Sequence, residues 1–284
     1  MRPFAAVVVL LLALCAAFAH AADRGVYTIV DGDARVLRAT TWYRLEAGAR
    51  AGNGDVIDAG ERAYVQAELS GGGTLGIVGP ALAHLAALPL AADKAGPAEL
   101  VLMRGWFKAA AAGKPRPLLL RLPTATLTLA DGVIVVHDDP AQDELFVERG
   151  RASVSTPGLR GKDSAREARE GEYWRRSGDR AFVNVDHPSP AFIAAMPRGL
   201  RDALPSLASR FAAAAPPSLP AGREVTFAEA EPWLSGTSRK VFARRFTTRL
   251  ADPAFRAAAA AHPIPEWDRT LHPEKYRPRS DAGG

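Results

Sequence analysis

Apolar and polar residues alternate in short stretches over Gly25 to Asp179, and glycine-rich turns separate the stretches. The stretch Val26 to Val30 is followed by a turn at Asp31-Gly32-Asp33 and by a further alternating stretch from Ala34, which is the pattern of a β-hairpin. Closely spaced short strands predict a sandwich, a barrel or a solenoid rather than βαβ units. We therefore predict a β domain over residues 22–180.

A seven-residue pattern occurs twice within this region. Glu99 to Gly105 reads ELVLMRG and Glu144 to Gly150 reads ELFVERG, at an offset of 45 residues. Each copy ends in Arg-Gly and leads into another strand-like stretch. The repeat predicts two halves that stack as β-layers, because each layer needs a neighbour to cover its apolar face. A chance similarity between simple strand patterns is the alternative.

Helical spacing replaces the alternation in the last third of the chain. Apolar residues from Leu200 to Phe211 lie three or four positions apart, as on one face of a helix, and Pro205 interrupts the pattern. Thr226 to Glu229 has the spacing of a capping box, which marks a helix start. We predict a linker over 181–189 and a small helical region over 190–284. The predicted fold class is thus mainly β with a helical C-terminal region.

The first 21 residues read as an export signal. The apolar run Phe4 to Phe18 follows Arg2 and precedes Ala19-His20-Ala21, a combination typical of a cleaved signal peptide. The run is shorter than a membrane span. Cleavage after Ala21 removes Cys15, the one cysteine of the chain. Lipidation of Cys15 is the alternative, although a lipobox normally has a small residue where Leu14 stands. We expect a location in the periplasm or cell envelope of a Gram-negative bacterium.

Charge and composition narrow the chemistry. The 284 residues include 36 Lys and Arg against 31 Asp and Glu, a net charge of +5. Such a balance suits an anionic partner, but export argues against nucleic acid. A mature chain without cysteine has no thiol nucleophile. The histidines form neither H-x-x-x-H nor H-E-x-x-H, and no Gly-x-Ser-x-Gly occurs. We predict no catalytic residue, no metal and no cofactor.

The densest acidic stretch runs from His137 to Glu144. Several carboxylates close together are the ligands that Ca²⁺ prefers, but the spaced ligands and central glycine of a calcium loop are missing. We therefore favour a solvated hairpin end for this stretch.

The β region resembles the FecR family of periplasmic sensor domains. The resemblance rests on an opening element, Gly25 to Arg38, on Tyr43 to Gly48, and on Gly54 to Gly60, where Ala59 replaces the usual threonine. A later strand-like element, Leu145 to Val154, is similar to the one that ends the family's second half. Hydrophobic alternation and glycines carry the resemblance over about 150 residues. The sensor that names the family has a membrane span, whereas we expect only an export signal here, so direct control of a sigma factor is not expected.

The resemblance implies a non-enzymatic module that binds or signals through a protein partner in the envelope. Two alternatives stay open: binding of peptidoglycan or lipopolysaccharide through the arginines between 160 and 180, and a hydrolase with an unrecognised carboxylate pair. The oligomeric state is also open. Aromatic residues beside arginines suit a binding surface, although aromatic residues dominate cores as well. The candidate surface comprises Trp42, Tyr43, Arg44, Trp106, Phe107, Arg166 and Arg169.

Overall fold

The computed structural model describes residues 24–90, 96–111, 116–156, 164–178, 180–185, 187–235 and 238–276. The predicted export signal lies outside these ranges. Among the described residues, no helix combines the length and the apolar character that a membrane crossing requires.

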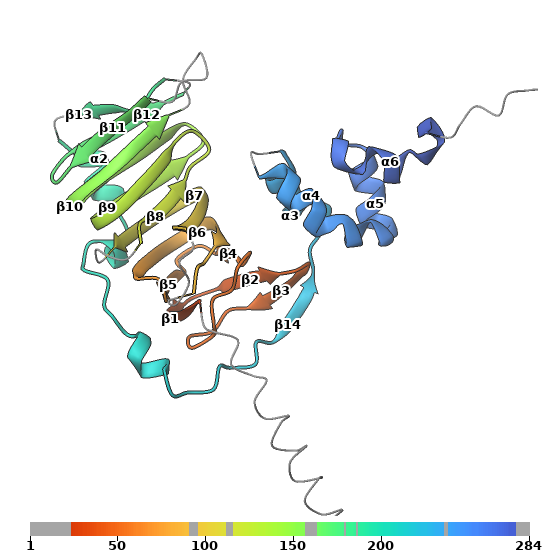
Figure 1. The fold of residues 1–284 in the computed structure, drawn as a ribbon, viewed down its shortest axis with the longest axis horizontal. Helices are drawn as coiled ribbons and strands as arrows, with labels where there is room; N and C mark the ends of the chain where they lie inside the picture. Colours follow the sequence, from red (N-terminus) through yellow and green to blue (C-terminus); the bar gives the residue numbers. More distant parts are fainter. Residues whose placement is uncertain are drawn as a thin grey trace, which may run out of the picture.

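The described chain is mainly β, as predicted, and its strands form one mixed sheet of 14 strands (Figure 1). All the strand pairs are antiparallel except β7 with β8. The strands are β1 (Gly25–Asp31), β2 (Ala34–Arg38), β3 (Thr41–Arg44), β4 (Val56–Ala59), β5 (Tyr64–Leu69), β6 (Gly73–Ala87), β7 (Ala98–Ala111), β8 (Leu118–Arg121), β9 (Thr126–Asp139), β10 (Gln142–Thr156), β11 (Ser164–Arg169), β12 (Tyr173–Ser177), β13 (Val183–Val185) and β14 (Ala221–Glu224).

Four long strands, β6, β7, β9 and β10, divide the sheet into two layers. Each of them pairs with different neighbours in its two halves; in β6, residues 73–78 pair with β5 and residues 81–84 with β4. Layer 1 holds β1, β5, β12, β13 and one half of each long strand. Layer 2 holds β2, β3, β4, β8, β11, β14 and the other halves. The main core lies between the layers, where side chains such as Leu75, Leu100 and Leu127 are fully buried.

Glycines mark the bends at which the long strands pass from one layer to the other. Gly105, Gly132 and Gly150 have φ values of +106°, +128° and +76°, a region that favours glycine because it has no Cβ. The Arg-Gly ends of the sequence repeat are two of these bends. The copies approach from opposite layers: Glu99 to Arg104 lies in layer 2, and Glu144 to Arg149 lies in layer 1.

The segment after the sheet crosses the outer face of layer 1. It forms α2 (Pro190–Ala195) and two short 3-10 helices, η1 (Arg198–Leu200) and η2 (Ala208–Phe211), with extended chain around Pro205. Phe192, Met196 and Leu200 bury Trp106, Val135 and Tyr173 of the sheet. The predicted apolar helical face is therefore realised only in short pieces, because proline cannot continue a helix.

Buried polar side chains of layer 1 hold the extended part of this segment. Lys108, which is 1% exposed, donates to the carbonyl of Leu200 at 3.0 Å and forms an ion pair with Glu148 at 2.7 Å. Gln66 donates to the carbonyl of Pro205 at 2.8 Å. These contacts satisfy polar groups that would otherwise be buried without partners.

The chain then adds β14 to the edge strand β3 and continues into the helical region. The helices form one apolar cluster with four side chains of layer 2, namely Leu37, Trp42, Val56 and Leu82. The helical region thus covers part of the outer face of layer 2. It comprises α3 (Phe227–Ser235), α4 (Arg239–Phe246), η3 (Thr247–Ala251), α5 (Pro253–Ala260), η4 (Pro265–Trp267), α6 (Asp268–Leu271) and η5 (Pro273–Tyr276).

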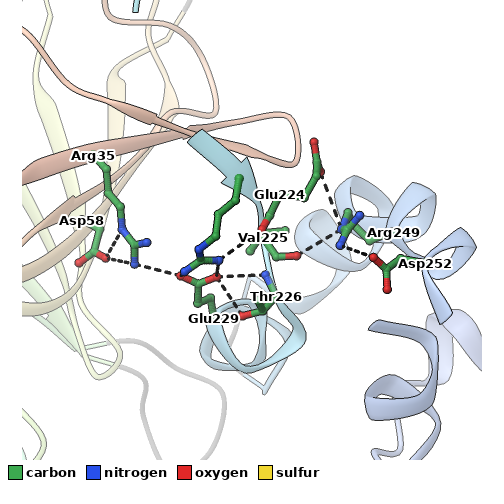
Figure 2. A network of polar contacts seen from close by, with 9 residues as sticks. Arg35, Asp58, Glu224, Val225, Thr226, Glu229, Arg249 and Asp252 are labelled. Atoms are coloured by element: carbon green, nitrogen blue, oxygen red, sulfur yellow. Dashed lines mark hydrogen bonds and ion pairs between the residues drawn. The ribbon is translucent and has the colours of Figure 1, made fainter. Parts of the chain in front are cut away.

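The junction between β14 and α3 confirms a helix start at the predicted capping box and contains one half of it, the contact from Glu229 back to Thr226. The backbone N–H of Thr226 donates to Glu229 Oε2 at 3.0 Å. Glu229 also accepts hydrogen bonds from Nη1 and Nη2 of Arg223, at 2.6 and 2.8 Å, and forms an ion pair with Arg35 of β2 at 3.0 Å. Arg35 in turn reaches Asp58 on β4, so Glu229 joins the helix to the sheet (Figure 2). Burial alone would raise the pKa of Glu229, but these donors lower it to about 2.

We expect Glu229→Gln to destabilise the protein by about 1 kcal/mol near neutral pH, the typical cost of a lost helix cap. Because the folded-state pKa lies below the ordinary value of 4.5, this contribution is present above about pH 4.5 and fades as the pH falls toward 2. Urea unfolding at several pH values measures the gap between the two proteins. Glu61→Gln, at an exposed position, is the control, and a gap that does not change with pH would contradict the assignment.

Gly105→Ala tests whether the bend at Gly105 has room for a side chain. A Cβ at Gly105 would lie 2.5 Å from the Cβ of Ala81, whereas a Cβ at Gly72, which also has a positive φ, would meet nothing within 4 Å. Gly72→Ala therefore carries only the backbone cost of about 1 kcal/mol, and Gly105→Ala adds overlap worth about 1–3 kcal/mol more. Thermal and urea unfolding compare the two variants. Equal losses would show that crowding at the bend is unimportant.

Candidate functional site

A cleft of about 1310 Å³ lies on the outer face of layer 2, beside α4. Its floor is formed by outward side chains of β6, β7, β8 and β9, among them Ala86, Val101 and Thr126. Loops 50–55 and 122–125 also line it, and Val241 and Arg245 of α4 contribute a wall. The cleft exists because the helical region covers β2, β3, β4 and the near side of β6 but leaves the neighbouring strands open.

Arginine dominates the charge of the cleft. The carboxylates of Asp55 and Glu99 are the acidic groups among the described lining residues. Because fixed charges of one sign in a cleft attract ligands of the opposite sign, the arrangement favours an anionic ligand. The arginines that line the cleft are Arg24, Arg38, Arg50, Arg121 and Arg245.

Two of these arginines are matched by the two carboxylates. Arg38 donates to both carboxylate oxygens of Asp55, at 3.0 and 2.9 Å, and the hydroxyl of Tyr27 donates to Asp55 at 2.9 Å. Burial, with the nearby Asp55, raises the pKa of Tyr27 well above its ordinary value. Arg121 pairs with Glu99 across β8 and β7. The Arg38–Asp55 pair is therefore structural and orders the loop at the end of the cleft.

Arg245 has a different environment. Its guanidinium donates to the backbone carbonyls of Ala39, Gly54 and Leu37, at 2.5, 2.5 and 2.8 Å. No carboxylate of the described residues forms an ion pair with it. Burial lowers its pKa to about 10, so it remains charged at neutral pH. Arg245 thus places a positive charge at the wall of the cleft, hydrogen-bonded to neutral carbonyls and lying over the rings of Phe242 and Phe246.

His84 lies beside this charge. Its ring is 5% exposed and packs edge-on against Phe242 and Trp233, with ring centroids 4.8 and 5.8 Å away. The Nδ1 atom is buried and has no hydrogen-bond partner. Burial, together with the positive charge of Arg245, lowers the pKa of His84 to about 4. The ring is therefore neutral at pH 7, and its Nδ1 is enclosed by the surrounding protein.

The first three candidate residues from the sequence lie together, but outside this cleft. Trp42, Tyr43 and Arg44 line a separate hollow of about 650 Å³ with Arg35 and Arg223. Trp42 is 4% exposed and belongs to the cluster under the helices. The guanidinium of Arg35 lies 4.2 Å from its ring centroid. This tryptophan therefore packs mainly against its own chain.

The other four candidates lie at three further places. Phe107 is fully buried between the layers, and Trp106 stacks on His137 at 4.1 Å beneath α2. Arg166 and Arg169 are exposed on β11. They point to opposite faces of that strand, because side chains alternate along a strand. The seven candidates are thus divided among four regions, and none of them lines the arginine-rich cleft.

Sequence reasoning missed the cleft because its residues form no local motif. The arginines come from the start of β1, from β2, from a loop, from β8 and from α4. Only a general signal, the excess of lysine and arginine over acidic residues, pointed to an anionic ligand. That signal did not identify which arginines line the same cleft.

The acidic stretch forms the β9–β10 hairpin. Its turn residues Pro140 and Ala141 are exposed, as predicted, but the prediction of a solvated end is wrong for Asp138 and Asp143. Asp138 and Asp143 are directly opposite each other on the two strands and are 4% and 0% exposed. Arg176 donates to Asp143 at 2.5 Å. Burial and the contact with Asp143 raise the pKa of Asp138 to about 9. We interpret the two carboxyl groups as a pair that shares one proton. This pair is buried, and neither residue lines the cleft.

Comparisons with known proteins show a distant likeness only. No protein-family model matches the chain, and no curated protein matches it. Two of the solved structures that do match are crystal structures of a "putative anti-sigma factor" from Parabacteroides distasonis ATCC 8503, at 13% and 12% identity and a TM-score of 0.39. Each match covers 46% of this chain and 59% of that chain. The FecR resemblance therefore stays a prediction.

Asp138→Asn tests the shared proton. The neutral carboxyl is favoured in the folded protein, so the stability that Asp138 contributes is greatest below about pH 4 and is lost as the pH rises toward 9. An amide imitates the protonated carboxyl. We expect Asp138→Asn to exceed the wild type in stability by at least about 1 kcal/mol near pH 8, since one pKa unit is worth about 1.4 kcal/mol.

Asp143→Asn is the matched variant at the opposite strand position. It removes the partner of buried Arg176, so it should destabilise the protein at every pH. Urea unfolding between about pH 5 and pH 9 measures both variants. If Asp138→Asn loses stability near pH 8 as Asp143→Asn does, the pair does not share a proton.

Proposed function

We propose that this protein is a non-enzymatic binding module of the periplasm or cell envelope, and that its cleft binds an extended, acidic segment of a partner protein. The observation that carries this proposal is the concentration of arginine in a large cleft that is part of the folded structure. The proposal gives a defined place to the protein–protein interaction that the sequence predicts.

The size of the cleft favours a polypeptide. Small-molecule sites usually have volumes of about 300–1,000 Å³, and this cleft is larger. Its floor crosses four strands, which are about 4.8 Å apart, so the floor is about 14 Å wide. That width accommodates about four residues of extended chain.

The lining residues suit a peptide that carries both acidic and apolar groups. Val101 and Leu122 lie among the arginines, and Val241 at the wall is 60% exposed. Apolar contacts of this kind contribute affinity that does not depend on salt, whereas the arginines contribute a part that salt screens. A wholly charged polymer would use only the second part.

The basic stretch between 160 and 180 gives weaker support to the anionic-polymer alternative. Arg169 pairs with Glu167 at 3.1 Å, and Arg176 with Asp143 at 2.5 Å. Arg175 donates to Gln142 at 3.0 Å. These guanidinium groups are occupied by partners from the same chain, so less of their charge is offered to a ligand.

Charges of opposite sign introduced at Val101, on the floor of the cleft, test the proposal. A fluorescent peptide that alternates Asp and Ser serves as the acidic probe, and one that alternates Asn and Ser is the neutral control. We expect the acidic peptide alone to bind the purified protein in fluorescence anisotropy. Val101→Glu should weaken that binding about tenfold, the effect of one nearby like charge at an intermediate dielectric, whereas Val101→Lys should retain it.

The same measurement separates the alternatives. Binding should weaken when salt is raised from roughly 50 to 200 mM. Equal binding of the two peptides, or equal effects of the two Val101 variants, would contradict the proposal. Binding of dextran sulfate without binding of the acidic peptide would assign the cleft to an anionic polymer.

A further inference from the structure

The outward side of α4 continues from the wall of the cleft. Val241 and Arg245, which line the cleft, lie about one turn apart on the helix. Lys240 and Arg244 each precede one of them, so they form the adjacent strip of the same helix, and both are exposed. This strip points away from the apolar cluster that the buried Phe242 joins. We call Lys240, Val241 and Arg244 the crest of α4.

The positive charge of the crest is not matched by the folded chain. Within the described residues, no carboxylate forms an ion pair with Lys240 or Arg244, whereas the neighbouring Arg239 pairs with Glu266 at 3.3 Å. The acidic side chains that the structure describes in β14 and the helical region are all paired with other groups. They are Glu224, Glu229, Glu231, Asp252, Glu266 and Asp268.

The stability of α4 does not account for this arrangement. Lys240 lies in the first turn, where the helix dipole favours negative charge, and that turn holds no acidic residue. Lys240 and Arg244 are four positions apart, a spacing at which like charges on a helix repel each other. A bound anion would relieve this repulsion. Val241, between the two cations, is 60% exposed and offers an apolar contact.

We propose that the acidic partner segment continues out of the cleft and over the crest of α4, an inference that rests on the proposed function of the cleft. Carboxylates of the segment pair with Lys240 and Arg244, and one of its apolar side chains covers Val241. The floor of the cleft combines the same residue types, since Val101 and Arg121 are partners on β7 and β8. One ligand chemistry therefore suits both surfaces.

The dimensions of the two surfaces define the length and pattern of the segment. A helix with its side chains is about 10–12 Å across, so the crest adds about four residues of extended chain to the four that the floor accommodates. Lys240 and Arg244 are about 6 Å apart along the helix axis, and alternate residues of an extended chain are about 6.6 Å apart. A segment with acidic residues at alternate positions therefore matches both cations.

Two Asp-Ser peptides of different length test this continuation in anisotropy titrations at roughly 150 mM salt. A peptide of about four residues fills the floor, and one of about eight residues also reaches the crest. We expect the double variant Lys240→Gln with Arg244→Gln to weaken binding of the long peptide about fivefold, the scale of two exposed ion pairs. Its affinity for the short peptide should change less than about twofold, because salt screens charges outside the floor.

The double variant Arg180→Gln with Arg198→Gln is the matched control. It removes the same net charge at two exposed positions, one between β12 and β13 and one in η1 on the outer face of layer 1. The control should bind both peptides as the wild type does. Equal losses in the two double variants would show attraction by net charge alone and would overturn the inference. Thermal unfolding checks that both variants fold.

The remaining outcomes separate the crest from the cleft. If the short peptide binds but the crest variant keeps the full affinity for the long peptide, the inference alone is overturned. If neither peptide binds the wild-type protein, the inference is overturned together with the proposed function. Binding of phosphatidylglycerol vesicles that depends on Lys240 and Arg244, with no loss for the long peptide, would assign the crest to a lipid surface instead.

Discussion

The outer face of layer 2 carries apolar side chains, and the C-terminal helices bury them. Removing this apolar surface from water stabilises the fold. Leu37, Trp42 and Val56 are at most 4% exposed in the folded chain. The helices achieve this by packing Trp233, Phe242 and their neighbours against the sheet. The cover ends at Leu82 on β6 and Met103 on β7, the last side chains along the sheet that pack against the helical cluster. The cleft lies where the helices end, between α4 and the part of the same sheet face that they leave open.

Polar groups then determine how the C-terminal segment wraps the sheet. On layer 1, Lys108 and Gln66 bind backbone carbonyls of the extended segment. At the junction with β14, Glu229 joins α3 to Arg35 on the sheet. On layer 2, Arg245 binds the carbonyls of Leu37 in β2, of Ala39 in the turn after it and of Gly54 in the loop before β4. Each of these buried or half-buried groups needs a partner, so together they fix the path of the segment and hence the position of the cleft wall.

Local sequence patterns predicted the parts of the structure that depend on near neighbours. The alternation around Val26 gave strands, and the spacing of Thr226 and Glu229 gave a helix start that the structure contains. The pattern failed at Asp138 and Asp143, which looked like a solvated turn but are buried. Their burial comes from Arg176 on β12 and from the layer around them, and neither lies next to them in the sequence.

The sequence by itself determined the mainly β class, the helical C-terminal region and the excess of basic over acidic residues. These features follow from backbone geometry, side-chain periodicity and composition, which are local or global properties of the chain. Only the tertiary structure decided that Arg24, His84 and Arg245 line one cleft, while Phe107 is enclosed in the core. The physical reason is that such neighbours are brought together by strand pairing and by the packing of helices on a sheet, and no short stretch of sequence records either of these long-range contacts.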